Sequence, residues 1–186
     1  MASVRVATEN DAAAVSAIYA PYVRETAISF EELPPAPDEM SGRIKRTLAT
    51  HPFLVFEDGA SVVAYAYASA HRERAAYRWS ADVAIYAAPA VHRRGVGRAL
   101  YAHLLNILRR QGFHAAFAGI TLPNASSIGL HEAMGFEHVG TYAEVGFKLG
   151  AWRDVGWWQY RISIGAPVGA PIAFPDLRDG ADTVTL

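Results

Sequence analysis

The stretch that decides the fold runs from residue 82 to residue 100 and reads DVAIYAAPAVHRRGVGRAL. Its first six residues favour a buried strand, which ends before Pro89. The second part favours a helix, because apolar residues recur at positions 96, 100, 104 and 107 or 108. The turn between them carries Gly95 and Gly97, which leave room for an anion beside the backbone. Unpaired N–H groups and the helix dipole make such a helix start a binding site for a phosphate.

The same patterns, followed outward from this stretch, predict a mixed α/β domain. We expect strands at 4–6, 53–57, 61–70, 78–87, 114–122, 139–145 and 155–164. We expect helices from about 8 to 19, from 38 to about 48, from 95 to 110 and from 124 to about 134. In chain order the elements read βααβββαβαββ, an α/β arrangement with a mixed central sheet flanked by helices.

The chain length and its composition predict one domain followed by a tail. The 186 residues, 52% of them hydrophobic, suffice for one compact core. After residue 164 the sequence becomes rich in Gly, Ala and Pro without periodicity. We therefore expect a domain over residues 1–164 and an extended or disordered tail over 165–186.

Charge and cysteine content narrow the partners and the chemistry. The formal net charge is −1, so no general attraction to nucleic acid or to an anionic membrane is expected. Five arginines and no acidic residue lie between positions 83 and 131, which favours a small anionic ligand. The chain has no cysteine, which excludes disulfides, thiolate metal sites and a cysteine nucleophile. The sequence shows no membrane span or signal peptide, and a cytoplasmic protein is expected.

Other motifs that bind phosphate or metal do not fit this sequence. A Walker A loop needs Lys and Ser or Thr after its last Gly, whereas Arg98 and Ala99 follow Gly97. A dinucleotide fingerprint needs a third Gly where Leu100 stands. Neither a His-Glu-x-x-His zinc motif nor a Gly-x-Ser-x-Gly elbow occurs, so no metal is expected. A basic helix start whose glycines serve only the turn remains the structural alternative.

Several blocks of sequence resemble the GCN5-related N-acetyltransferases, and in particular their phosphinothricin acetyltransferase branch. The blocks span most of the chain, from about residue 5 to residue 163. They are Ser29-Phe30-Glu31, Ala76-Tyr77-Arg78-Trp79, Arg93-Arg94-Gly95-Val96-Gly97 with Leu100-Tyr101-Ala102-His103-Leu104-Leu105, Leu122-Pro123-Asn124, Leu130-His131-Glu132-Ala133-Met134-Gly135-Phe136, Gly146-Phe147-Lys148 and Trp152-Arg153-Asp154-Val155-Gly156-Trp157-Trp158-Gln159. The resemblance implies the fold of that family, acetyl-CoA as co-substrate and a homodimer.

The resemblance also implies where acetyl-CoA binds. The strand backbone of Ile85, Tyr86 and Ala87 would hold the pantetheine arm and the acetyl carbonyl. The pyrophosphate would lie against Arg93, Arg94, Gly95, Val96, Gly97 and Arg98. Asn124 would touch the pantetheine arm, although a plain helix cap after Pro123 is an equally good interpretation of this residue. His92 stands where the family's turn has Gln or Arg.

Acetyl transfer to an amine requires a base, a donor to the oxyanion and a proton for the leaving thiolate. Asp82, where the branch usually has Glu, is the candidate base, with Glu31 or Glu32 as rivals and a structural strand-end acid as the alternative. A backbone N–H of Ile85 or Tyr86 is the candidate oxyanion donor. His131 is the candidate acid, and a histidine bonded on a helix face is its structural alternative.

The predicted substrate side combines charge and aromatic residues. Arg72 and Arg74 present guanidinium forks that suit a carboxylate or phosphinate, unless they are only an exposed charged turn. The resemblance adds Phe30, Glu31 and Tyr77 to the substrate site. Leu149 replaces a frequent His, which leaves the identity of the substrate open.

Together these features predict an enzyme that transfers acetyl directly from acetyl-CoA to a small-molecule amine in a ternary complex. The expected substrate is the α-amino group of a small amino acid or of an analogue of the phosphinothricin, methionine sulfone or methionine sulfoximine type. Another small amine or a protein N-terminus is the alternative within this class. A sensor that binds acyl-CoA without catalysis is the alternative outside it.

Overall fold

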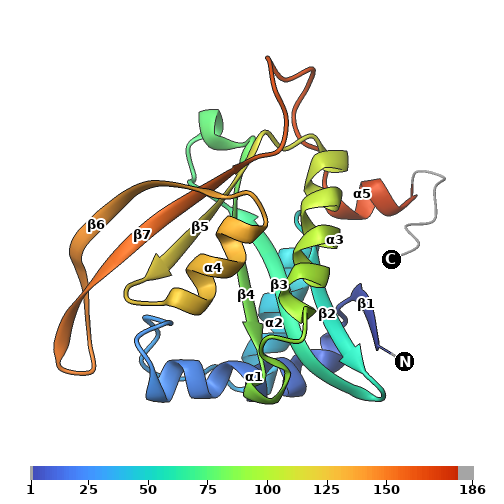
Figure 1. The fold of residues 1–186 in the computed structure, drawn as a ribbon. Helices are drawn as coiled ribbons and strands as arrows, with labels where there is room; N and C mark the ends of the chain where they lie inside the picture. The colour runs from blue at the N-terminus through green and yellow to red at the C-terminus, as the bar shows by residue number, and fades with distance from the viewer. Residues whose placement is uncertain (1, 180–186) are drawn as a thin grey trace.

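A computed structural model describes residues 2–179 and shows a seven-stranded sheet with helices on its faces (Figure 1). The strand order is β1-β2-β3-β4-β5-β7-β6. The strands are β1 Ala2–Val6, β2 Phe53–Asp58, β3 Ser61–Ala70, β4 Ser80–Ala87, β5 Ala115–Thr121, β6 Glu137–Lys148 and β7 Ala151–Arg161. The helices are α1 Ala12–Glu25, α2 Pro37–Leu48, α3 Val96–Gln111, α4 Ala125–Ala133 and α5 Phe174–Asp179. The predicted order of elements is therefore confirmed through β7.

Among the described strands, only β4 and β5, in the middle of the sheet, pair in parallel, and their pairing is short. Strands β1 to β4 pair with one another in antiparallel fashion, and so do β5, β7 and β6. Between β4 and β5 the register covers only Ser80 with Ala115, Ala81 with Ala116 and Asp82 with Phe117. Beyond Asp82 the two strands diverge, although both continue. The sheet consequently has an opening in its centre.

Two apolar clusters cover the two faces of this sheet. On one face α1 and α2 pack against β2 and β3 through residues that include Val15, Ile44 and Tyr65. On the other face α3 buries Leu100, Leu104 and other side chains against the strands. Figure 1 shows α1 and α2 beside the lower ends of the central strands and α3 alongside the sheet. Helices on both faces hold the divergent strands β4 and β5 in place.

Helix α1 is longer than its sequence pattern predicted. The expected end near Tyr19 is wrong, because the helix continues through Pro21 to Glu25. Its apolar residues at 15, 18, 19 and 23 all lie buried on one face, so packing extends the helix past the proline. The loop to α2 therefore covers only residues 26–36.

The expectation of an extended or disordered tail is wrong for residues 174–179, which form α5. Phe174 and Leu177, one helical turn apart, are buried in the main core. The side-chain amide of Gln111 donates to the carbonyl of Ile172 at 2.9 Å, and the Trp79 indole N–H donates to that of Gly169 at 2.7 Å. The core thus extends beyond the expected boundary at residue 164. The last part of the predicted tail, residues 180–186, lies outside the described residues.

Within residues 2–179, none of the helices has the length and apolar character that crossing a membrane requires.

Candidate active site

The opening between β4 and β5 is the first part of the site. Since β4 pairs with β5 only up to Asp82, one edge of the following backbone is left without a strand partner. Such an edge offers N–H and C=O groups to a bound chain. The carbonyl of Ala87 is already occupied, because the Tyr22 hydroxyl donates to it at 2.6 Å. The pocket in the opening is lined by Ile28, Val83, Ala84, Ile85, Tyr86, Tyr101, Ala118, Gly119, Ile120, Thr121, Asn124, Ser127 and His131.

The start of α3 forms the second part of the site, at the other end of β4. Gly95 precedes the helix with φ +80°, a left-handed conformation that favours glycine. The first intrahelical bond runs from the N–H of Ala99 to the carbonyl of Gly95 at 3.1 Å. The N–H groups of residues 96, 97 and 98 precede this bond, and no side chain caps the helix. An anion can therefore bind there.

The structure adds a packing reason for glycine at position 97. A Cβ there would lie 2.8 Å from Leu130 Cδ2 and 3.4 Å from Ile85 Cδ1. Gly97 therefore allows α3 to pack closely on α4 and β4, and its role in leaving room for the phosphate stays a prediction. The backbone N–H of Gly97 still belongs to the uncapped first turn.

Asp82 lies where the two central strands separate, and it is not alone. Its Oδ1 is 2.6 Å from Nδ1 of His71. Burial raises the pKa of the Asp82 carboxyl, while the hydrogen bond from His71 lowers it in part. Sequence reasoning missed His71. The pairing depends on the register of β3 and β4, which aligns Ser69 with Asp82 and so places residue 71 diagonally across from Asp82.

The rival base Glu31 is bound by other residues. Both of its oxygens accept hydrogen bonds from Arg43, at 2.6 and 2.9 Å, and one also accepts from the Tyr19 hydroxyl at 2.9 Å. The Arg43 guanidinium holds the pKa of Glu31 below its usual value. A carboxylate held in this way is a poorer base than Asp82. Its direct contact with a substrate stays a prediction.

His131 lies buried at the opening with both ring nitrogens hydrogen-bonded. Its Nδ1–H donates to the carbonyl of Ser127 at 2.7 Å, and in the neutral ring its Nε2 accepts from the Tyr101 hydroxyl at 2.9 Å. Burial lowers the pKa of His131, which favours the neutral ring. Neutral His131 thus has no free N–H to give to a thiolate, whereas Tyr101, another residue that sequence reasoning missed, brings a hydroxyl to the same opening.

The structure places the predicted substrate residues in different parts of the molecule. Around Asp82, the Arg72 guanidinium carbon lies 5.6 Å from the Trp157 ring centre, and the Tyr77 ring is 5.9 Å from that of His71. Phe30 instead lies in the loop after α1, packed on Gly146 of β6. Arg74 is exposed at the start of the short helix Ala75–Tyr77. Asn124 caps α4 by accepting from the Ser127 N–H at 3.1 Å, and it also lines the opening.

Lys148 fixes the loop that carries Phe30 and Glu31. Its ammonium group donates to the carbonyls of Val23 and Glu31, both at 2.7 Å, and to that of Ser29. These bonds join β6 to the loop between α1 and α2. Ile28 of the same loop lines the opening, so Lys148 positions one wall of the site.

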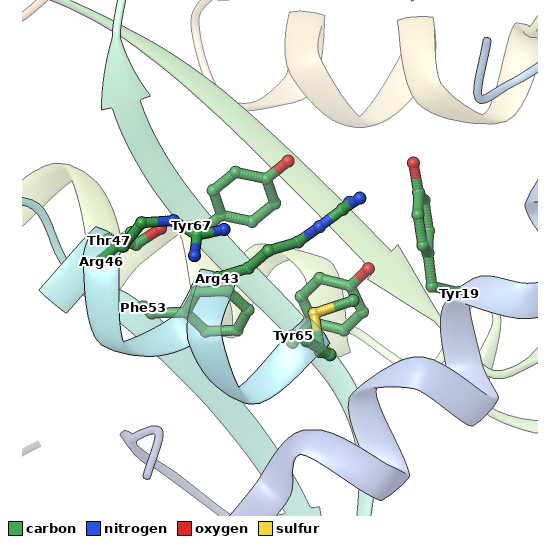
Figure 2. A pocket seen from close by; sticks show the side chains of 8 residues that line it. Tyr19, Arg43, Arg46, Thr47, Phe53, Tyr65 and Tyr67 are labelled. Carbon is green, nitrogen blue, oxygen red and sulfur yellow. The ribbon is translucent and has the colours of Figure 1, made fainter. Parts of the chain in front are cut away.

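A second pocket lies between α2 and the strands β2 and β3 (Figure 2). Its lining residues are Tyr19, Met40, Arg43, Arg46, Thr47, Phe53, Tyr65 and Tyr67. The Arg43 guanidinium at this pocket is neutralised by Glu31 and Glu39. None of the lining residues belongs to the predicted acetyl-CoA or substrate set, and this pocket is separate from the opening between β4 and β5.

Comparison with known proteins agrees with this geometry. The family model described as "Acetyltransferase (GNAT) domain" matches residues 4–157. The chain belongs to the GNAT acetyltransferases. A phosphinothricin N-acetyltransferase of Streptomyces viridochromogenes is 38% identical over 164 residues, which are 88% of this chain and 90% of that protein. An L-methionine sulfoximine/L-methionine sulfone acetyltransferase of Salmonella typhimurium is 32% identical over 161 residues, 86% and 94% of the two chains.

A solved structure supports the same assignment of this GNAT chain. The phosphinothricin acetyltransferase of Sinorhizobium meliloti, in complex with AcCoA, has a TM-score of 0.86 and 35% identity, covering 94% of this chain and 96% of that one. The predicted fold class and enzyme class, an acetyl-CoA-dependent N-acetyltransferase, are confirmed.

Replacing Lys148 by Met tests the link between β6 and the loop after α1. The variant loses charge-assisted hydrogen bonds to three carbonyls, each worth about 1.5–3 kcal/mol when buried and less at this partly exposed site. We expect a lower Tm and a higher KM for the amine, with an unchanged Kd for acetyl-CoA. Calorimetry and steady-state kinetics measure all three. Lys45→Met, at an exposed lysine 3.7 Å from Glu9, is the control, and equal effects in both variants would contradict the role of Lys148.

Proposed function

We propose that this enzyme acetylates the α-amino group of a small amino acid or of an analogue of the phosphinothricin, methionine sulfone or methionine sulfoximine type. The observation that carries the proposal is the grouping of Asp82, His71 and Arg72 where β4 and β5 separate. This grouping offers a base for the ammonium and a cation for a carboxylate within a few residues. The names of the relatives from Streptomyces viridochromogenes and Salmonella typhimurium support the substrate class.

The open edge of β4 is the proposed place for the acetyl-CoA arm. Ile85, Tyr86 and Ala87 supply the backbone, and Asn124 approaches from α4. The pyrophosphate binds the first turn of α3, with Arg93, Arg94 and Arg98 around it. An N–H of Ile85 or Tyr86 stabilises the oxyanion that forms when the amine attacks the thioester.

The acetyl group passes directly to the amine in this proposal. The chain has no cysteine to carry it, and its sequence shows no motif of an activated Ser or Lys nucleophile, which supports direct attack of the amine on the bound thioester. The pair formed by Asp82 and His71 accepts the proton of the incoming ammonium. The leaving thiolate forms near Tyr101 and His131, whose hydrogen bond of 2.9 Å places a hydroxyl proton at the opening.

A homodimer through the hairpin of β6 and β7 is the second element of the proposal. This hairpin extends from the sheet as a long arm (Figure 1). Large apolar side chains along it are at least half exposed, which marks a surface for protein contact. They are Val139, Tyr142, Val145, Phe147, Leu149 and Trp152.

A cytoplasmic location stays a prediction.

A thiol-release assay over paired amines tests the substrate class. If Arg72 or Arg74 binds the substrate carboxylate, methionine sulfone is acetylated about 10 to 150 times more efficiently than its amide, the worth of one charge-assisted hydrogen bond. Arg72→Ala or Arg74→Ala then removes most of this preference, while Arg110→Ala, at an exposed site on α3, leaves it intact. Equal kcat/KM for methionine sulfone and its amide would refute the carboxylate contact, and acetylation of peptides alone would refute the substrate class.

Light scattering coupled to size-exclusion chromatography tests the dimer. The wild-type protein should elute with twice the mass of one 20.1 kDa chain. Trp152→Glu places a charge in the apolar surface of the hairpin and should shift the protein to the monomer. Glu137→Gln, at an exposed position on the same strand as Phe147, is the control. A monomeric wild-type protein, or a dimer that Trp152→Glu does not weaken, would contradict the proposed interface.

A further inference from the structure

His71 is the side chain bonded to Asp82, and its surroundings hold it in one orientation. The ring stacks on Phe117 of β5, with centroids 4.5 Å apart and an angle of 20° between the planes. Trp157 of β7 meets it edge-on at 6.0 Å. The side chain of His71 is only 13% exposed. Because Asp82, Phe117 and Trp157 fix the orientation of the imidazole, its ring nitrogens point in defined directions, as a proton transfer requires.

The ring lies at the closed end of the opening. Its two partners, Asp82 and Phe117, form the last pair in the register of β4 and β5, and the lining of the opening begins with the next residue of each strand. Trp157, which contacts the His71 ring, also lies against a residue that lines the opening, because the Trp157 ring is 3.2 Å from the Cβ position of Gly119. His71 is therefore next to the place where the β4 edge becomes free.

The hydrogen bond to Asp82 determines which ring nitrogen is available. A carboxylate can only accept, so Nδ1 of His71 carries the proton of the 2.6 Å bond. In the neutral ring Nε2 then has a lone pair. Within residues 2–179, no side chain or backbone group forms a hydrogen bond with Nε2. The titratable or charged groups around the ring are Asp82 of β4, Tyr77 and the neighbouring Arg72, whereas Phe117 and Trp157 carry no charge.

A histidine oriented by a carboxylate suits this reaction better than the carboxylate alone. A general base works best when its pKa lies near the working pH, and an imidazole is ordinarily closer to neutrality than a carboxyl group. The Asp82 side chain is short, and its Oδ1 is already used by His71. The imidazole adds a second basic atom, Nε2, beside Asp82, and the carboxylate stabilises the imidazolium that forms.

We propose that Nε2 of His71 takes the proton from the substrate ammonium and that Asp82 is the positioning residue that orients and stabilises this histidine. The assignment rests on the proposed function. In the first step the N–H bond of the ammonium breaks and a bond from Nε2 to that proton forms, which leaves a neutral amine and an imidazolium. The amine attacks the thioester carbon, and the C–S bond breaks. The second amine proton passes to the thiolate, and His71 returns its proton to water.

The test compares His71→Phe, Asp82→Asn and the double variant in the thiol-release assay with methionine sulfone. Phe keeps a ring on Phe117 but has no base, so kcat should fall about 10² to 10⁴-fold at pH 7. The loss should shrink as pH rises, since more amine arrives already neutral. The kcat of Asp82→Asn should fall to within tenfold of the kcat of His71→Phe. The double variant should lose no more kcat than the slower of the two single variants. His114→Phe, outside the site, should match the wild type.

Two further measurements keep the outcomes distinct. Calorimetry with acetyl-CoA shows whether each variant retains its fold and the cofactor half of the site. Nitrogen-15 spectra of the wild-type histidines report the ring tautomer directly, and His71 should carry its proton on Nδ1. Nearly full activity in His71→Phe together with a large loss in Asp82→Asn would overturn the assignment, as would a proton on Nε2. A wild-type enzyme that acetylates none of the amino acid analogues would instead refute the proposed function.

Discussion

The site of this enzyme depends on one constraint, the end of the pairing between β4 and β5 after Asp82 and Phe117. Three features of the site follow from that point. The backbone beyond it has a free edge, Asp82 stands at the point itself, and the strand then leads through Pro89 to the uncapped start of α3. One interruption of a sheet thus brings together an open strand edge, an acid and an anion site.

The interruption persists because packing on both faces prevents the strands from closing. Tyr86 is partly buried and packs against Tyr19, Tyr22 and Tyr65 on one face, and Val83 belongs to the core under α3 on the other. Trp157 of β7 lies so close to Gly119 of β5 that a methyl group on residue 119 would be crowded. Closing the gap would have to displace several large buried side chains, each worth about 1.5–3 kcal/mol of burial.

Local patterns were sufficient to predict the order of elements and the strand, turn and helix of residues 82–100. They failed where distant parts of the chain decide. The length of α1 depends on the burial of Val23, and α5 forms because Phe174 and Leu177 enter the core. Spacing predicts Gly97 in the turn, but its close contact with Leu130 of α4 depends on the tertiary fold. The pairing of Glu31 with Arg43 and of Asp82 with His71 requires the register and the tertiary fold, which spacing alone does not contain.

Hydrogen–deuterium exchange of the backbone amides, with and without acetyl-CoA, tests the central role of the open β4 edge most directly. Bound acetyl-CoA should slow exchange at those amides of residues 83–87 that face away from β3 and at the uncapped amides of residues 96–98. The amides of β1 and β2, which are distant in the sheet order, should exchange as before. Protection of β1 and β2 with no change at 83–87 and 96–98, in a sample saturated with acetyl-CoA, would contradict this account.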